Sequence, residues 1–173
     1  MHYFIFPEKD STIFEASSSV NSGMDEVLEI RKNVSGTGAS VDVSRILIKF
    51  DTTFFQEASA SGLIHQTGSR AAKYFLNLYD ANPKALATSQ SLYAYPVSGS
   101  WDMGTGRSYD NPQTADGCSW KYRYNETNGT LWASGSGAED GAGGVWYSSS
   151  IAPAASASLN HKSQDLKIDV TGT

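Results

Sequence analysis

Residues 43–50, with the sequence VSRILIKF, give the strongest secondary-structure signal in the chain. In an extended conformation their side chains would alternate between two faces. One face would carry Ile46, Ile48 and Phe50, and the other would carry Arg45, Leu47 and Lys49. β-branched residues favour that conformation. The stretch therefore predicts a β-strand that ends before Asp51.

Similar alternation recurs on both sides of this stretch, separated by residues that favour turns. Residues 54–61 are the one place where a short helical turn is expected, and residues 98–117 are expected to form a long loop. About eight or nine short strands follow from this pattern. The further expected strands are 2–7 and 11–14, 26–31, 71–79, 91–97, 119–124, 131–132, 145–147 and 165–170.

The composition agrees with an all-β fold. The chain has 173 residues, of which 18% are charged and 12% aromatic, and it is rich in glycine and small hydroxyl residues. This composition excludes a helical bundle, a coiled coil and a collagen-like fibre. We expect a single domain over 1–173, an antiparallel β-sandwich of the jelly-roll type.

Charge and hydropathy restrict the partners. The net charge is −5, and the longest basic run is the pair Arg31–Lys32, so no nucleic-acid partner is expected. No run of 18 apolar residues occurs, so membrane insertion is not expected either. Residues 1–6 are interpreted as part of the first strand and not as a signal peptide. The single cysteine, Cys118, is expected to be a buried apolar residue.

Eight short motifs occur along the chain in a fixed order. They are 10–13 (DSTI), 21–23 (NSG), 28–30 (LEI), 44–51 (SRILIKFD), 72–79 (AKYFLNLY), 101–106 (WDMGTG), 119–120 (SW) and 169–171 (DVT).

This ordered set resembles the DNRLRE-domain family, jelly-roll modules of bacterial surface proteins, of proteins beside polysaccharide-active enzymes and of tailed-phage particles. The resemblance implies a jelly-roll fold, with Asp10 and the turn at Asn21–Gly23 holding a loop together by side-chain hydrogen bonds. The positions that carry the family's fold motif are Asp10, Asn21, Gly23, Arg45, Phe50, Asp51 and Asp169.

The family usually continues beyond the motif at 169–171, whereas this chain ends at Thr173. We therefore expect either that the sequence is the N-terminal part of a longer chain or that its sheet lacks the closing strand. In the second case a neighbouring subunit would supply the missing strand by strand addition.

The sequence contains few candidate catalytic or metal-binding residues. Carboxylates in the loops could pair for glycoside hydrolysis, but they are expected to be solvated, so no catalytic residue is assigned and the chain is not expected to be an enzyme. No cofactor is expected. A structural Ca²⁺ is the one metal considered, and its candidate ligands are Asp102, Asp110 and Asp116.

Aromatic residues gather in the second half of the chain. Trp101 and Tyr109, in a loop with Arg107, are candidates for stacking on a glycan; Trp132 and Trp146 are candidates for a glycan site or a subunit interface. The alternative is that these rings fill the core or close the end of the sandwich.

We therefore expect a non-enzymatic structural or accessory protein of a bacteriophage particle, in its capsid, neck, baseplate or tail appendage. Its partners would be other virion proteins or copies of itself, with attachment to a host-surface glycan as a second role. The alternative is a carbohydrate-binding module of a longer extracellular bacterial protein, which would be secreted or lie at the cell surface.

Overall fold

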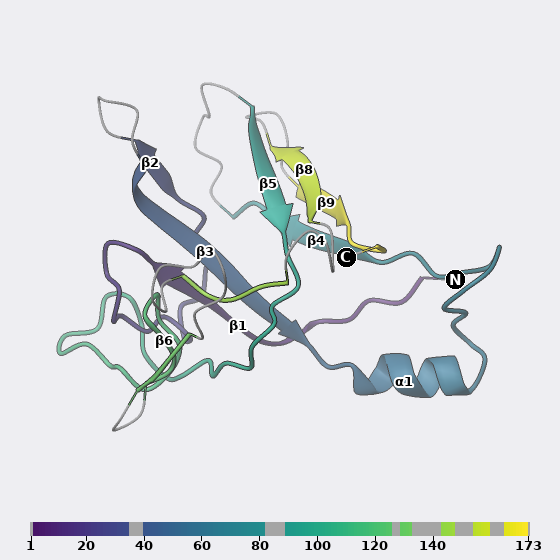
Figure 1. The fold of residues 1–173 in the computed structure, drawn as a ribbon, viewed down its shortest axis with the longest axis horizontal. Helices are drawn as coiled ribbons and strands as arrows, with labels where there is room; N and C mark the ends of the chain where they lie inside the picture. Colours follow the sequence, from purple (N-terminus) through teal and green to yellow (C-terminus); the bar gives the residue numbers. More distant parts are fainter. Residues whose placement is uncertain are drawn as a thin grey trace. The chain divides into compact units, whose positions relative to one another are not determined.

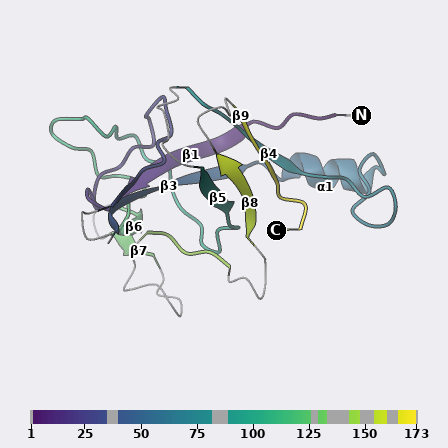
Figure 2. The same cartoon turned by 90° about the horizontal axis from the view of Figure 1, so that it is seen from above.

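The computed structural model describes residues 2–34, 40–81, 89–125, 129–132, 143–147, 154–159 and 165–172. Strands dominate this part of the chain, which has one short helix (Figure 1; Figure 2 gives the view from above). The all-β prediction is confirmed, as is the short helix expected near 54–61. The elements are β1 (Pro7–Phe14), β2 (Lys32–Val34), β3 (Ser40–Phe50), α1 (Thr53–Ala60), β4 (Phe75–Tyr79), β5 (Gln90–Ala94), β6 (Tyr122–Tyr124), β7 (Thr130–Leu131), β8 (Ala155–Leu159) and β9 (Asp165–Asp169).

The chain divides into two compact units, each built from two separate stretches of sequence. The first unit contains Met1–Asp51 and Val97–Val145, and the second contains Thr52–Pro96 and Trp146–Thr173. Each is described by itself below. The arrangement of all strands into one jelly-roll sandwich over 1–173 stays a prediction.

The first unit is organised by β3, which pairs antiparallel with β1 on one edge and with β2 on the other. Ile46 lies opposite Thr12 in the β1–β3 register. β6 and β7 form a second, two-stranded antiparallel sheet.

The core of this unit lies against the face of β3 that carries Leu47. The buried cluster consists of Ile13, Leu47, Trp101, Cys118, Trp120 and Trp132, with Val43 packed against it. Ile46, Ile48 and Phe50 lie on the opposite face of β3 and are only half-buried. Arg45 shares the inner face with Leu47, and its guanidinium carbon lies 4.6 Å from the centre of the Trp120 ring. The stacked aromatic ring allows the charged residue to occupy this face.

The second unit has two antiparallel strand pairs, β4 with β9 and β5 with β8. Its buried cluster is Ala155, Leu166 and Ile168, and Leu76, Leu78 and Leu92 pack against it. The predicted alternation in 71–79 and 165–170 is confirmed, since every second side chain of β4 and β9 faces this cluster.

The end of β9 is fixed to the start of β4. Asp169 accepts a hydrogen bond from the backbone N–H of Thr171 at 3.0 Å, and the Thr171 hydroxyl accepts one from the N–H of Tyr74 at 2.9 Å. Hydrogen bonding by the Thr171 side chain, and then by its backbone N–H, favours the charged form of the Asp169 carboxylate and lowers its pKa.

Several expected strands differ from those observed. Residues 2–6 are not part of a strand, since β1 begins at Pro7, and 26–31 is irregular apart from its junction with β2. β8, with the sequence ASASL, was not expected, because alanine and serine have low β-propensity. In the part of the chain that the structure describes, no helix has the length and apolar character needed to span a lipid bilayer.

Candidate functional site

The long loop after Trp101 is anchored by one buried side chain, that of Asn21. Its Nδ2 donates hydrogen bonds to the carbonyl of Met103 at 2.7 Å and to that of Cys118 at 2.9 Å. Its Oδ1 accepts a hydrogen bond from the N–H of Gly106 at 2.7 Å. One amide therefore joins both ends of the loop, which is the holding role that the sequence predicted for the turn at 21–23.

Asp169 lies on β9 of the second unit, and the other positions of the predicted fold motif lie in the first unit. Gly23 lies so close to the Met103 carbonyl that a Cβ there would overlap it. Asp10 is half-buried on β1, and desolvation raises its pKa. Phe50 is the last residue of β3, and Asp51 follows it at the surface.

The tip of the loop brings Arg107 and Tyr109 together. The Arg107 guanidinium donates to the Tyr109 hydroxyl at 3.2 Å and lies 3.5 Å from the Glu26 carboxylate. The backbone N–H of Arg107 donates to Asp110 Oδ2 at 2.9 Å. Tyr109 is exposed, so this pair is accessible to a ligand, as expected.

Trp101 and Trp132 are not accessible. They are only 4% and 2% exposed and belong to the core cluster of the first unit. Trp132 also donates its indole N–H to the carbonyl of Ser119 at 2.9 Å. Their ring faces pack on protein, so the proposal that a glycan or a second subunit contacts them is wrong for this structure, and the core alternative is the correct one.

The three candidate calcium ligands do not converge. Asp116 accepts hydrogen bonds from the Thr105 N–H and hydroxyl at 2.9 and 2.6 Å. Partial burial raises the pKa of Asp116, whereas these hydrogen bonds lower it, and the net shift is downward. Asp110 caps the Arg107 turn, and Asp102 is exposed. Among the residues described, no group of three or more histidine, cysteine or acidic side chains is placed to hold a metal ion.

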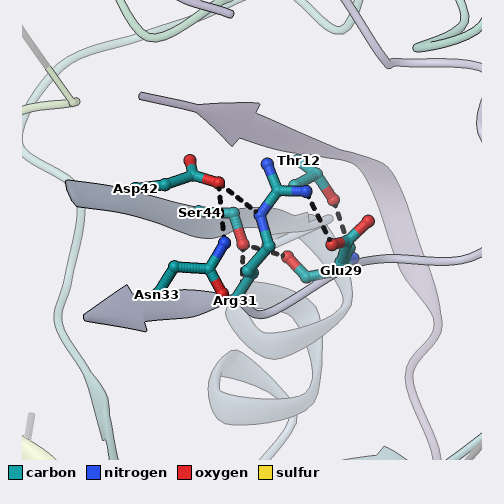
Figure 3. A network of polar contacts seen from close by, with 6 residues as sticks. All are labelled: Thr12, Glu29, Arg31, Asn33, Asp42 and Ser44. Carbon is teal, nitrogen blue, oxygen red and sulfur yellow. Dashed lines mark hydrogen bonds and ion pairs between the residues drawn. The ribbon is translucent and has the colours of Figure 1, made fainter. Parts of the chain in front are cut away.

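A polar network fixes the segment that precedes β2 (Figure 3). The Thr12 hydroxyl accepts a hydrogen bond from the Glu29 N–H at 3.0 Å. The Ser44 hydroxyl donates to the Glu29 carbonyl at 2.7 Å and accepts from the Arg31 N–H at 2.6 Å. Side chains of β1 and β3 therefore supply bonds that a neighbouring strand would otherwise make, which explains why 26–31 is ordered without being a strand.

The charged side chains of Glu29, Arg31 and Asp42 lie next to one another in this network (Figure 3). Arg31 Nε lies 2.8 Å from Asp42 Oδ2, which also accepts a hydrogen bond from Asn33 at 3.2 Å. The Arg31 guanidinium also lies over the Phe14 ring, 5.4 Å from its centre. The arginine is engaged by protein groups on several sides, so we assign it a structural role.

Cys118 is buried, as expected from the sequence. Burial raises the pKa of its thiol to about 11. The thiolate is therefore scarce at neutral pH, which makes this residue unsuited to nucleophilic chemistry.

The second unit carries an exposed row of aromatic rings. The ring centres of Tyr93 and Tyr95 are 6.4 Å apart, and those of Tyr95 and Trp146 are 5.7 Å apart. We call these three residues the aromatic row. Trp146 was expected to be a surface residue, whereas its two tyrosine neighbours were not identified as site residues. The spacing of Tyr93 and Tyr95 in the predicted strand 91–97 was the available signal, but their meeting with Trp146 depends on the fold.

Comparison of the chain with models of protein families, with curated proteins and with solved structures found no match. The fold and the sites above therefore define the class: an all-β protein with anchored loops and exposed aromatic side chains.

Proposed function

We propose that the chain is a non-enzymatic structural or accessory protein of a bacteriophage particle, and that it acts by packing against other proteins. The observation that carries the binding role is the amount of apolar surface left uncovered. Among the described residues, more large hydrophobic side chains are exposed than buried. Isolated exposed apolar residues are ordinary, but grouped ones mark interaction surfaces.

Two groups supply this argument. The first is the segment before β1, where the side chains of Phe4 and Phe6 are 76% and 82% exposed. The second is the aromatic row of the second unit. Aromatic residues are enriched at the centre of protein interfaces, so both groups fit contact with a partner surface.

The placement in a phage particle is supported by the ordered motifs and their resemblance to the DNRLRE-domain family. Two motif positions have structural roles here that suit a shared scaffold: Asn21 anchors the long loop, and Asp169 fixes the end of β9. The protein would then reach the exterior as part of the virion after lysis, in contact with other virion proteins or with copies of itself.

The test is to purify particles from the phage whose genome carries the gene, by density-gradient centrifugation, and to quantify the chain by mass spectrometry. The proposal expects the chain to band with the major capsid protein at a constant ratio across the particle peak. A chain that stays in the soluble lysate fractions, or a gene that lies outside any phage genome, contradicts the proposal.

A carbohydrate-binding module is the second candidate function. The specific observation in its favour is the aromatic row, because exposed rings provide flat apolar faces beside hydroxyl groups. A phage-particle protein that attaches to host-surface glycans would also need the aromatic row. The particle protein and the carbohydrate-binding module therefore share one site that can be tested.

A further inference from the structure

The outward face of the β5–β8 pair differs from its inward face in chemistry. Leu92 and Ala94 turn toward the buried cluster of the second unit, whereas Tyr93 is 62% exposed. Ser156 lies opposite Tyr93 in the register, and Ser158 lies opposite Ser91; all three serines are exposed. The outward face of this pair is therefore made of tyrosine and serine.

Trp146 extends this face beyond β5. Its position is fixed by the backbone, because the N–H of the next residue, Tyr147, donates to the carbonyl of Pro96 at 3.0 Å. The planes of Tyr93 and Tyr95 are inclined by 30°, and those of Tyr95 and Trp146 by 40°. The side chains of Tyr93, Tyr95 and Trp146 are 62%, 42% and 39% exposed, so the three neighbouring rings form a strip that remains exposed.

The chemistry of this strip selects a class of ligand. A pyranose ring has an apolar C–H face that packs on an aromatic ring and hydroxyl groups that exchange hydrogen bonds with hydroxyl side chains. β5 and β8 contain no charged residue. An acidic sugar would therefore find no cation on these two strands, whereas a neutral one brings no charge that needs a partner there.

We propose that the aromatic row, with the hydroxyls of Ser91, Ser156 and the two tyrosines, is a binding site for neutral pyranose oligosaccharides. This inference rests on the attachment role considered under the proposed function and names its site and ligand class.

Trp146 provides a direct probe of the site. It is 39% exposed, whereas the other three tryptophans are between 2% and 8% exposed. Iodide quenching of tryptophan fluorescence in the full chain should therefore report on Trp146. We expect neutral gluco-, chito- or xylo-oligosaccharides of four to six sugars to bind and to protect this fluorescence from iodide.

The variants Tyr93→Ala and Trp146→Ala should each weaken binding by about fivefold or more, measured by titration calorimetry. Tyr79→Ala is the matched control, because Tyr79 is 75% exposed at the end of β4 in the same unit but lies outside the aromatic row. It should bind as the unchanged chain does. Far-UV circular dichroism checks that each variant is folded.

Three results would overturn the inference. The first is binding of acidic sugars alone. The second is equal binding by Tyr79→Ala and Tyr93→Ala. The third is that none of the neutral oligosaccharides binds or protects the fluorescence. Particle association is measured separately by mass spectrometry, so a chain that bands with the particle but binds no sugar contradicts this inference alone.

Discussion

The side-chain amide of Asn21 donates a hydrogen bond to the carbonyl of Cys118, which lies 97 positions further along the chain, at a distance of 2.9 Å. The same buried side chain binds Met103 and Gly106. The two ends of the long loop are therefore held together by this one side chain, although the loop contains no strand.

Replacement of this residue should destabilise the first unit. Asn21→Ala leaves two carbonyls and two N–H groups, those of Gly23 and Gly106, without their partner, so we expect the free energy of unfolding to fall by about 2–4 kcal/mol. Urea denaturation measures it. Asn33→Ala is the control, because Asn33 is exposed on β2 and its bond to Asp42 lies at the surface; its effect should stay within about 0.5 kcal/mol. Equal effects of the two variants would contradict the anchoring role.

Gly104 tests how closely the loop packs on Asn21. Its φ is +75°, and a Cβ there would lie 2.6 Å from Asn21 Oδ1. Gly62 has nearly the same φ, +73°, but open space around it. In both alanine variants the free energy of unfolding should fall by about 1 kcal/mol, because alanine is strained at positive φ. In Gly104→Ala it should fall by about 1–3 kcal/mol more, because the added Cβ overpacks the site. Equal losses in urea denaturation would show that the loop adapts freely.

The pKa of Cys118 makes stability fall at high pH. Folding raises the pKa of this thiol from 9.0 to about 11, so its contribution is complete below pH 9 and is lost as the pH rises toward 11. We expect the free energy of unfolding to fall less between about pH 8 and about pH 10.5 in Cys118→Ala than in the unchanged chain. Tyrosine ionisation affects both chains equally. Parallel pH profiles would mean that the thiol is not buried.

The four tryptophans should separate into structural and surface residues. Trp101→Ala removes a ring from the core and should lower the free energy of unfolding by about 3–5 kcal/mol. Trp146→Ala should lower it by less than about 1 kcal/mol, because its ring is partly exposed. Chemical denaturation followed by circular dichroism measures both. An unchanged free energy of unfolding in Trp101→Ala would contradict the core role of Trp101 and make it a surface candidate again.

The sequence predicted the elements whose pattern is local. Alternation in β4 and β9 and the short helix α1 were recognisable because their own side chains decide them. The local pattern did not reveal which face of β3 lies inward, since the stacking of Arg45 on Trp120 involves a residue far along the chain. Segment 26–31 also alternates, but the hydroxyls of Thr12 and Ser44 bind its backbone, which no local pattern reveals.

The site was predictable to a smaller extent. The anchoring turn at Asn21 followed from its motif, and the exposure of Tyr109 followed from its loop. Whether a tryptophan stacks on a ligand or fills the core depends on packing, so the sequence left both interpretations open for Trp101 and Trp132, and the structure places both rings in the core. The aromatic row joins Tyr95 to Trp146, and only the tertiary structure brings them together.

Hydroxyl-radical footprinting of the chain, free and in purified particles, tests the central claim that its exposed apolar side chains are covered by partner proteins. Phe14, which is buried, serves as the internal reference. We predict that Phe4 and Phe6 react readily in the free chain and become protected in the particle while Phe14 stays unreactive in both. Equal reactivity of Phe4 and Phe6 in the two states would contradict the account.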